Sequence, residues 1–569
     1  MIPHSSRPNI SGATADSTGH EALPKALWII LGVVAFVTSA GINLVEWMKE
    51  QSITYPDPTN WFNAFFVTVG KTEPASLYVL LGFCLLTLLL WTRKRPSTHF
   101  LEWGKRFSPS KIIVGLAIFT FAFSTWGTWF VAHNHALSAD ENMPDFQAKI
   151  FLSGQTSAAI PEELRLVAPN LKPIQAILSK DHSKWNQSYL PVYAAIRTPF
   201  VALQLQTLVN PLLGALTVIC MAGVIGLLWS GQPWLSVAGA SLVALTPQIL
   251  VTGMTAYSMP AHLALNTLWL WLYLQPGKRR YWLAPVVGVL AIGLHSPFVH
   301  ALFVTPFLVR LLFQRRWKAT SIYAIIYLLG CLGCWLWWRQ FSPTNANPDA
   351  SVFGSNLKRI LFTQPLNIVN LLSWNALPLF IPFLFALRYF RHLPVTVCDA
   401  TWAFLLTFIF YSLVSFDQGF GWGNRYCYGV LGCLVLIGVA GLNEWSHRSS
   451  PQQPAQFLVV GLLLTFLVAI PLRCWQVEQF IRPFATARDS FNRMNVDLII
   501  YDPRMAWYSS DLRRNDPLLQ KRPLVANLLN LTVEQAEALR AQFPKNRFVT
   551  GEELAAYGLS TKKWSPPTP

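Results

Sequence analysis

The sequence predicts a polytopic α-helical membrane protein with about thirteen transmembrane helices and a small external α/β domain at its C-terminal end. Hydrophobic residues make up 53% of the 569 residues and charged residues only 12%, whereas a soluble domain has about 25% charged residues. The formal net charge is +17, but the basic residues cluster beside apolar segments. This placement indicates membrane topology and anionic lipid, not a nucleic-acid partner.

The N-terminal part is predicted to be a tail followed by a hairpin. Residues 1–25 are polar and read as a disordered cytoplasmic tail. Two apolar segments within residues 26–92 are long enough to form an extra transmembrane hairpin, and Arg93-Lys94-Arg95 follows it. Because basic residues stay on the cytoplasmic side, the hairpin begins and ends inside.

The next span, residues 112–132, runs outward and is followed by a long external loop, residues 133–206. A loop of this length is rarely a plain linker. Periodic runs at 162–167 and 174–178 predict interfacial helices. The aromatic and polar stretch 185–193 closes the loop and is suited to the level of the lipid headgroups.

The segment 281–312 has basic residues at both ends, so a single span would place one basic set outside. Two short helices turning at His295-Ser296-Pro297 keep both sets inside, and proline-interrupted spans often line a site. The same rule orders the other spans, at 208–229, 233–254, 259–274, 321–338, 366–389, 402–414, 428–442 and 457–472. The membrane domain therefore covers residues 112–474, with the N-terminus inside and the C-terminus outside.

Residues 475–569 have a soluble composition. Residues 496–501 read as a buried strand, and residues 548–550 as a second one. Thr532 and Gln535 form a capping-box pattern that opens a helix reaching about residue 543. The sequence thus predicts a small α/β domain on the external face.

The adjacent carboxylates Asp140 and Glu141 lie just beyond the 112–132 span, and two interpretations of them are open. In the first, Asp140 caps the helix that follows, at the start of a solvated loop. In the second, the pair is a base or a metal ligand at the boundary of water and lipid.

The predicted topology brings further polar groups to the same face. Arg425 lies in the Gly-rich loop 419–426, where a span re-enters the membrane. It is either a snorkelling arginine or a clamp for phosphate, whose oxygens a guanidinium matches. His295 is either a satisfied core histidine or a functional group at membrane depth. No P-loop, GxGxxG, HExxH or regular metal-ligand spacing is present, so nucleotide use is unsupported.

In several ordered motifs the chain resembles the GT-C superfamily of integral-membrane glycosyltransferases, near the bacterial relatives of dolichyl-phosphate-mannose–protein mannosyltransferases. The resemblance covers residues 112–550. The motifs that carry it are Asp140-Glu141 after a span, the run from Phe146-Gln147 to Gly154, Val209-Asn210-Pro211-Leu212-Leu213-Gly214, Gly423-Asn424-Arg425-Tyr426 and Asn515-Asp516-Pro517. The chain departs from the family in its N-terminal hairpin and in His295-Ser296-Pro297, where bacterial relatives often carry Arg-Pro.

The resemblance implies a function. It implies an inverting transfer of a sugar from a polyprenyl-phosphate donor to an envelope glycan, lipid or protein, with Asp140 as base and Glu141 assisting. The site residues implied for the substrate and the donor phosphate are Arg425, His295, Tyr426, Gln147 and Tyr189. A divalent metal, magnesium or manganese, is left open, with Asp140 and Glu141 as its ligands.

Two other functions are compatible with the sequence. One is a transporter or flippase of lipid-linked glycans, which requires a polar path across the whole bilayer. The other is a non-catalytic membrane scaffold. Eight scattered cysteines without a disulfide framework favour the bacterial inner membrane over other membranes.

Overall fold

The computed structural model describes residues 19–54, 73–92, 108–277, 280–340, 357–413, 422–449, 452–503, 512–528 and 531–559. Residues 1–18 of the predicted tail lie outside the described residues, as do Arg93-Lys94-Arg95 and Gly419 and Gly421 of the Gly-rich loop. Residues 19–25 are helical, so the prediction of a disordered tail is wrong for them.

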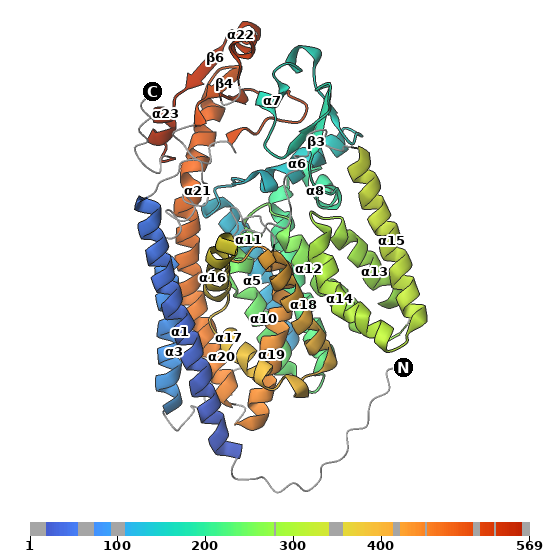
Figure 1. Cartoon of the computed structure of the whole chain (residues 1–569), viewed down its shortest axis with the longest axis vertical. Coiled ribbons are helices and arrows are strands. Elements are labelled where there is room, and N and C mark those ends of the chain that lie inside the picture. The colour runs from blue at the N-terminus through green and yellow to red at the C-terminus, as the bar shows by residue number, and fades with distance from the viewer. Residues whose placement is uncertain are drawn as a thin grey trace.

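A bundle of apolar helices runs along the long axis of the molecule, with two small sheets gathered at one of its ends (Figure 1). Seven helical segments among the described residues are long and apolar enough to span a membrane. They contain α1 (Gly19–Thr54), α5 (Pro109–Phe130), α9 (Val209–Leu228), α15 (Trp317–Gln340), α18 (Val395–Leu413), α19 (Leu431–Arg448), and α20 (Gln452–Leu464) joined to α21 (Ile470–Arg493) through a π-helical turn, Thr465–Ala469. The polytopic helical membrane class is thus confirmed, while the count of thirteen spans stays a prediction.

Further helices complete the bundle. They are α3 (Glu73–Thr92), α10 (Pro233–Ala244), α11 (Pro247–Gly253), α12 (Met259–Leu274), α13 (Arg280–Ile292), α14 (Pro297–Phe313), α16 (Leu357–Ser373) and α17 (Phe380–Arg388), with 3-10 turns at Gln206–Leu208, Phe390–His392 and Tyr428–Val430. The predicted hairpin at His295 is confirmed, because α13 ends before it and α14 begins with Pro297 at its first position.

Two segments predicted as single spans are divided in the structure. The 233–254 segment bends by 55° between α10 and α11. Pro247 lacks the N–H that would continue the helix and disfavours helical backbone at Thr246. The 366–389 segment is likewise split, since α16 ends at Ser373 and α17 begins at Phe380.

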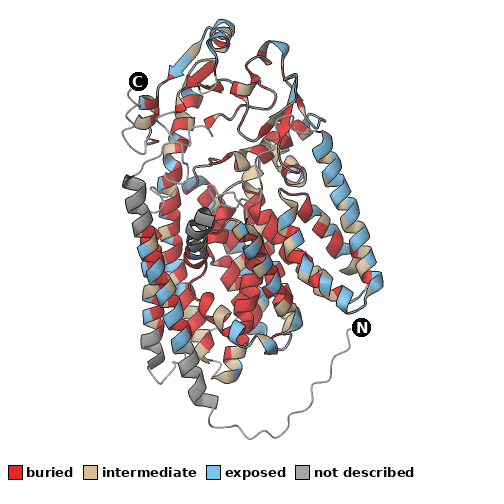
Figure 2. Ribbon diagram, in the orientation of Figure 1, coloured by how far each residue is buried: buried red, intermediate tan, exposed pale blue. Residues whose placement is uncertain are grey.

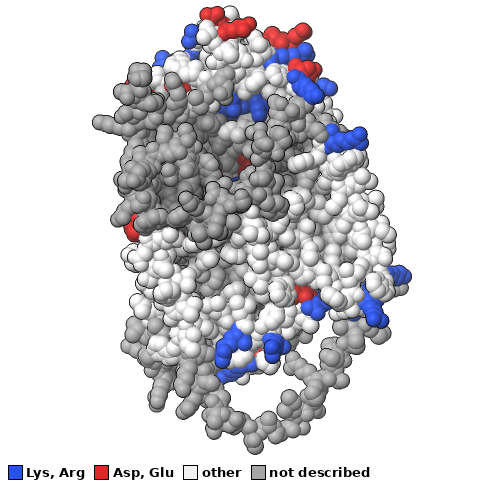
Figure 3. Space-filling model, viewed as in Figure 1, with Lys and Arg blue, Asp and Glu red and all other residues white. Residues whose placement is uncertain are grey.

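Burial sorts the helices into inner and outer ones. The largest core cluster draws mainly on α9, α10, α12, α17 and α19. Figure 2 shows these helices largely buried, whereas α15 is exposed along much of its length. Figure 3 shows acidic and basic side chains near both ends of the visible face, with mostly uncharged surface between them. An uncharged middle band with an apolar outer helix is the surface that a bilayer requires.

The loop after α5 folds into structure of its own. It contains α6 (Ala139–Leu152), a 3-10 turn (Glu162–Leu164), α7 (Ala168–Leu171), α8 (Val192–Ala202) and the strands β1 (Ala158–Ala159), β2 (Ala176–Leu178) and β3 (Lys184–Gln187). The strands form an antiparallel sheet in the order β1-β3-β2. The helix predicted at 174–178 is therefore wrong, because β2 pairs there with β3, Ile177 opposite Asn186.

The C-terminal α/β unit is confirmed. It contains β4 (Leu498–Tyr501), β5 (Leu524–Asn527), α22 (Val533–Gln542), β6 (Asn546–Val549) and α23 (Gly551–Ala556), with a parallel sheet in the order β5-β4-β6. Thr532 and Gln535 form the predicted capping box. The boundary predicted at 474–475 falls within α21, which runs continuously out of the bundle into this unit.

The two sheets share one hydrophobic core. Phe146 of α6 and Trp185 of β3 belong to the same buried cluster as Leu498 and Ile500 of β4. The C-terminal unit is therefore packed directly on the helix that carries Asp140 and Glu141.

Candidate functional site

The helix α6 places the two carboxylates at its first turn. Ser138 is its N-cap residue and has an extended backbone, and Asp140 and Glu141 follow in the first turn. Negative charge is stabilised at a helix N-terminus by the unpaired N–H groups and the helix dipole. Because successive residues on a helix point about 100° apart, the two side chains enter different surroundings.

Asp140 is the centre of a charged cluster. Its Oδ2 accepts a hydrogen bond from Nη2 of Arg425, with which it forms an ion pair, and its Oδ1 accepts one from the Tyr189 hydroxyl. The interpretation of Asp140 as a helix cap is wrong, because its oxygens bond to side chains from other segments. The Asp140 and Arg425 side chains keep 17% and 15% of their surface exposed, so the pair is mostly buried but still reached by water.

Aromatic rings surround this ion pair. The ring of His295 lies 4.1 Å from that of Tyr189, centroid to centroid. The Arg425 guanidinium lies over the ring of Tyr257, 5.1 Å from its centroid. Trp337 of α15 donates from Nε1 to the Tyr189 carbonyl oxygen at 3.2 Å. The structure thus brings Asp140, Arg425, Tyr189 and His295 together from four separate parts of the sequence.

Glu141 has a different role in the structure. It is buried, and its Oε1 accepts from the Leu137 backbone N–H at 3.2 Å while its Oε2 accepts from the Ala256 N–H at 3.1 Å. These bonds tie the start of α6 to the loop between α11 and α12. The carboxylate is a structural anchor beside the cluster and does not point at the same partners as Asp140.

The surroundings shift the pKa values of the two carboxyls in opposite directions. Burial alone would raise the pKa of Asp140, but the Arg425 charge, with support from His295 and the Tyr189 hydroxyl, holds that pKa below its usual value. Burial raises the pKa of Glu141 to about 7 despite its bonds to backbone N–H groups and the nearby Arg514 charge. At neutral pH Asp140 is therefore ionised, while Glu141 is divided between its two forms.

Gln147 lies outside the cluster of four, and Tyr426 lies beside it, next to Arg425 in the chain. Gln147 is buried two turns further along α6, where its Nε2 donates to the Thr156 carbonyl and its Oε1 accepts from the Gln187 N–H. It joins α6 to β3. The Tyr426 ring stacks on Tyr411 with 4.6 Å between centroids and an interplanar angle of 4°.

A divalent metal does not fit the acidic pair. Both oxygens of Glu141 accept from backbone N–H groups, and both oxygens of Asp140 accept from Arg425 and Tyr189. In the part of the chain that the structure describes, no group of three or more His, Cys, Asp or Glu side chains is placed to hold a metal ion. The two carboxylates thus act in separate places and not as a joint metal site.

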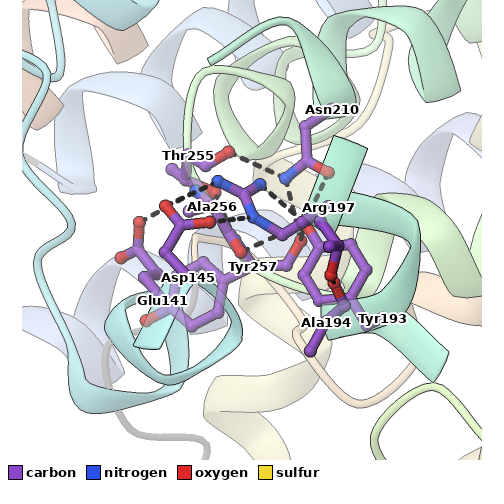
Figure 4. Close-up of polar contacts among 10 residues, drawn as sticks. Glu141, Asp145, Tyr193, Ala194, Arg197, Asn210, Thr255, Ala256 and Tyr257 are labelled. Carbon is purple, nitrogen blue, oxygen red and sulfur yellow. Dashed lines mark hydrogen bonds and ion pairs between the residues drawn. The ribbon is translucent and has the colours of Figure 1, made fainter. Parts of the chain in front are cut away.

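A second polar network beside the cluster was not predicted (Figure 4). Tyr193 and Asn210 bond the loop that carries Tyr257, and Arg197 joins Tyr193 to Asp145. Asn210 was noted only as part of a motif. Because the partners come from α6, α8 and α9, no local spacing in the sequence indicates that they meet.

Fold and site together define a polytopic helical membrane protein with a charged, aromatic-lined cluster at the sheet-bearing end of its bundle. No protein-family model matches the sequence, and no curated protein matches it. Among solved structures, the chain is similar to ArnT from Cupriavidus metallidurans bound to undecaprenyl phosphate, at 14% identity and a TM-score of 0.44, covering 77% of this chain and 90% of that one.

The apo structure of the same ArnT gives 14% identity and a TM-score of 0.44 as well, covering 76% of this chain and 88% of that one. At these values neither likeness carries an inference about the activity of this chain.

Proposed function

We propose that this protein is a membrane glycosyltransferase of the GT-C type, which moves a sugar from a polyprenyl-phosphate donor to a hydroxyl of an envelope glycan, lipid or protein at the external membrane face. The observation that supports this most is the contact of Asp140 with Arg425, residues 285 positions apart in the chain. A carboxylate beside a guanidinium supplies the two charges that such a transfer needs. The carboxylate takes up a proton, and the guanidinium binds phosphate.

In the proposed reaction Asp140 accepts the proton of the acceptor hydroxyl. The acceptor oxygen then forms a bond to the anomeric carbon as the bond from that carbon to the phosphate oxygen breaks. The phosphate leaves with the electron pair, and Arg425 stabilises its growing negative charge. Because the lipid phosphate is itself the leaving group, the reaction needs no nucleotide.

The resting contacts also suggest how substrate activates the base. Arg425 and Tyr189 occupy both oxygens of Asp140, and the guanidinium keeps the pKa of Asp140 low, which makes it a weak base. A donor phosphate that draws the guanidinium away frees one carboxylate oxygen and raises the basicity of Asp140. His295 and Tyr189 belong to the same cluster as Asp140 and are proposed to contact the donor.

The test is Asp140→Asn, assayed for sugar transfer from a panel of polyprenyl-phosphate sugars with the protein reconstituted in lipid. General-base catalysis contributes about 10²- to 10⁴-fold, so transfer by the folded and inserted variant is expected to fall by that factor. Asp181→Asn, which alters an exposed aspartate of the same loop, is the matched control. Undiminished transfer by Asp140→Asn removes Asp140 from the mechanism.

A further inference from the structure

The inference starts from an ion pair next to the proposed site, in which the guanidinium is buried and the carboxylate is partly exposed. Arg197 of α8 is 2% exposed and makes two bonds to Asp145 of α6, Nε to Oδ1 at 2.5 Å and Nη2 to Oδ2 at 2.9 Å. A planar guanidinium that faces both oxygens of a carboxylate fixes the orientation of both side chains. The pair therefore locks α8 against the helix that carries Asp140.

The same guanidinium reaches a tyrosine one turn away. Arg197 Nη1 donates to the Tyr193 hydroxyl oxygen at 3.3 Å. The Tyr193 hydroxyl lies 2.8 Å from Asn210 Oδ1, 3.1 Å from the Ala256 carbonyl oxygen and 2.9 Å from the Tyr257 carbonyl oxygen. A hydroxyl has one proton to donate, which these three acceptors share.

Asn210 of α9 holds the same loop from the other side. Its Nδ2 lies 2.7 Å from the Thr255 carbonyl oxygen and 2.8 Å from the Tyr257 carbonyl oxygen. Figure 4 shows the carboxamide and the Tyr193 hydroxyl converging on this loop. Together with Glu141, which accepts from the Ala256 N–H, they hold the loop through both its carbonyls and its amides.

The loop in turn carries the platform of the proposed phosphate clamp, because the Tyr257 ring lies beneath the Arg425 guanidinium. We infer that Tyr193 and Asn210 are positioning residues of the proposed reaction, which act through the loop Thr255–Tyr257 to place Arg425 for the donor phosphate. This inference rests on the proposed function for its catalytic meaning. The placement of the loop by the two side chains stands on their contacts alone.

The test uses Tyr193→Phe, which removes one hydroxyl, and Asn210→Asp, which removes the two donated N–H groups. Undecaprenyl phosphate in lipid nanodiscs is the binding probe. Losing about one net hydrogen bond is expected to weaken binding about fivefold in Tyr193→Phe, with more loss in Asn210→Asp. Thr198→Val is the matched control, since Thr198 lies on α8 and, within the described part of the chain, bonds only the Ala194 carbonyl of its own helix.

Hydrogen–deuterium exchange of the same proteins provides a readout without any ligand. Faster exchange of the amides around Ala256 in Tyr193→Phe and Asn210→Asp, but not in Thr198→Val, is the expected result. Unchanged exchange overturns the positioning inference, as does unchanged affinity for undecaprenyl phosphate in both variants.

The proposed function fails separately from the positioning inference. If the unaltered protein does not bind undecaprenyl phosphate, the donor class is wrong, and the exchange measurement still decides whether the two side chains place the loop.

Discussion

At the scale of single residues, Arg425 has two roles that mutations can separate. It is proposed to bind the donor phosphate, and it keeps the pKa of Asp140 low by its charge. Arg425→Gln is expected to raise the donor KM about 10- to 100-fold, the effect of losing a charged hydrogen bond of roughly 1.5–3 kcal/mol. Steady-state kinetics at varied donor concentration provides the measurement.

The same variant should shift the pH profile in a defined direction. Below its pKa the Asp140 carboxyl is protonated and cannot act as a base. Without Arg425 the burial of Asp140 is less opposed, so the pKa in the free enzyme rises and the acidic limb of kcat/KM moves to higher pH. Arg425→Lys keeps the charge and is expected to keep most of the limb in place. An unmoved limb in Arg425→Gln contradicts the pairing.

The residues of the site differ in how far a sequence reveals them. Asp140 and Arg425 stand out because charged groups beside apolar spans are costly and positive-inside topology places both on one side. His295 was a candidate as an ionisable group at membrane depth, and Tyr189 as a site residue implied by the resemblance. Glu141 could not be assigned correctly, since only the fold shows that its oxygens bond the N–H groups of Leu137 and Ala256. Tyr257 was missed, because nothing in its local sequence indicates Arg425.

At the scale of elements, the extra N-terminal hairpin is fixed to the bundle by a buried ion pair. Glu73 opens α3 and accepts from Arg473 of α21, Nη1 to Oε2 at 2.5 Å and Nη2 to Oε1 at 2.7 Å. The Ser373 hydroxyl also donates to Glu73, and the guanidinium lies over the Trp374 ring. With 1% and 4% of their side chains exposed, Arg473 and Glu73 are almost fully desolvated.

Removing one partner of this pair should destabilise the protein strongly. A single Glu73→Leu leaves the Arg473 charge buried and unopposed, at an expected cost of about 3–5 kcal/mol. The double variant Glu73→Leu with Arg473→Met removes both charges and is expected to regain much of the loss. Thermal unfolding in detergent measures this, with Thr87→Val on α3 as the control for a hydrogen bond within the same helix. Additive losses in the double variant would show that the two charges do not interact.

Element boundaries can be predicted from the sequence where proline and charge determine them. The predictions fail where tertiary packing determines the boundary. The hairpin at His295 was predictable because basic residues flank both ends of its segment. The bend at Thr246 and the break between α16 and α17 were not predicted, although Pro247 marks the first. The strand β2 was predicted as a helix, because only its pairing with β3 reveals it.

At the scale of the whole molecule, the C-terminal unit acts as a cap on the site helix. Trp185 of β3 donates from Nε1 to the Pro517 carbonyl oxygen at 2.8 Å, and Lys149 of α6 pairs with Asp516 at 3.3 Å. Arg514 donates from Nη2 to the carbonyl oxygen of Leu137, just before α6, at 3.1 Å. The sequence predicted both parts, but their shared core arises from contacts between residues more than 300 positions apart.

The pKa of Glu141 predicts how the stability of the protein depends on pH. The pKa of Glu141 is about 7 in the folded protein against an ordinary value of 4.5. Between these two pKa values the Glu141 carboxyl is protonated in the folded state and ionised in the unfolded state. The contribution of Glu141 to the free energy of unfolding therefore falls as pH rises from about 4.5 to 7 and is constant above that window. The melting temperature of the unaltered protein minus that of Glu141→Gln should fall across the window, because other titrating groups, the buried His135 included, are common to both.

Arg514→Met extends this prediction to the C-terminal unit. The Arg514 charge favours ionised Glu141 and so opposes the effect of burial. Without it the pKa of Glu141 rises further above 7, and the decline in melting temperature, measured against the double variant with Glu141→Gln, should continue to higher pH. Arg547→Met, which alters an exposed ion pair with Glu553 in the same unit, should leave the window unchanged. If Arg514→Met also leaves it unchanged, the C-terminal unit covers α6 without tuning its charge, and the electrostatics of the site belong to the membrane bundle alone.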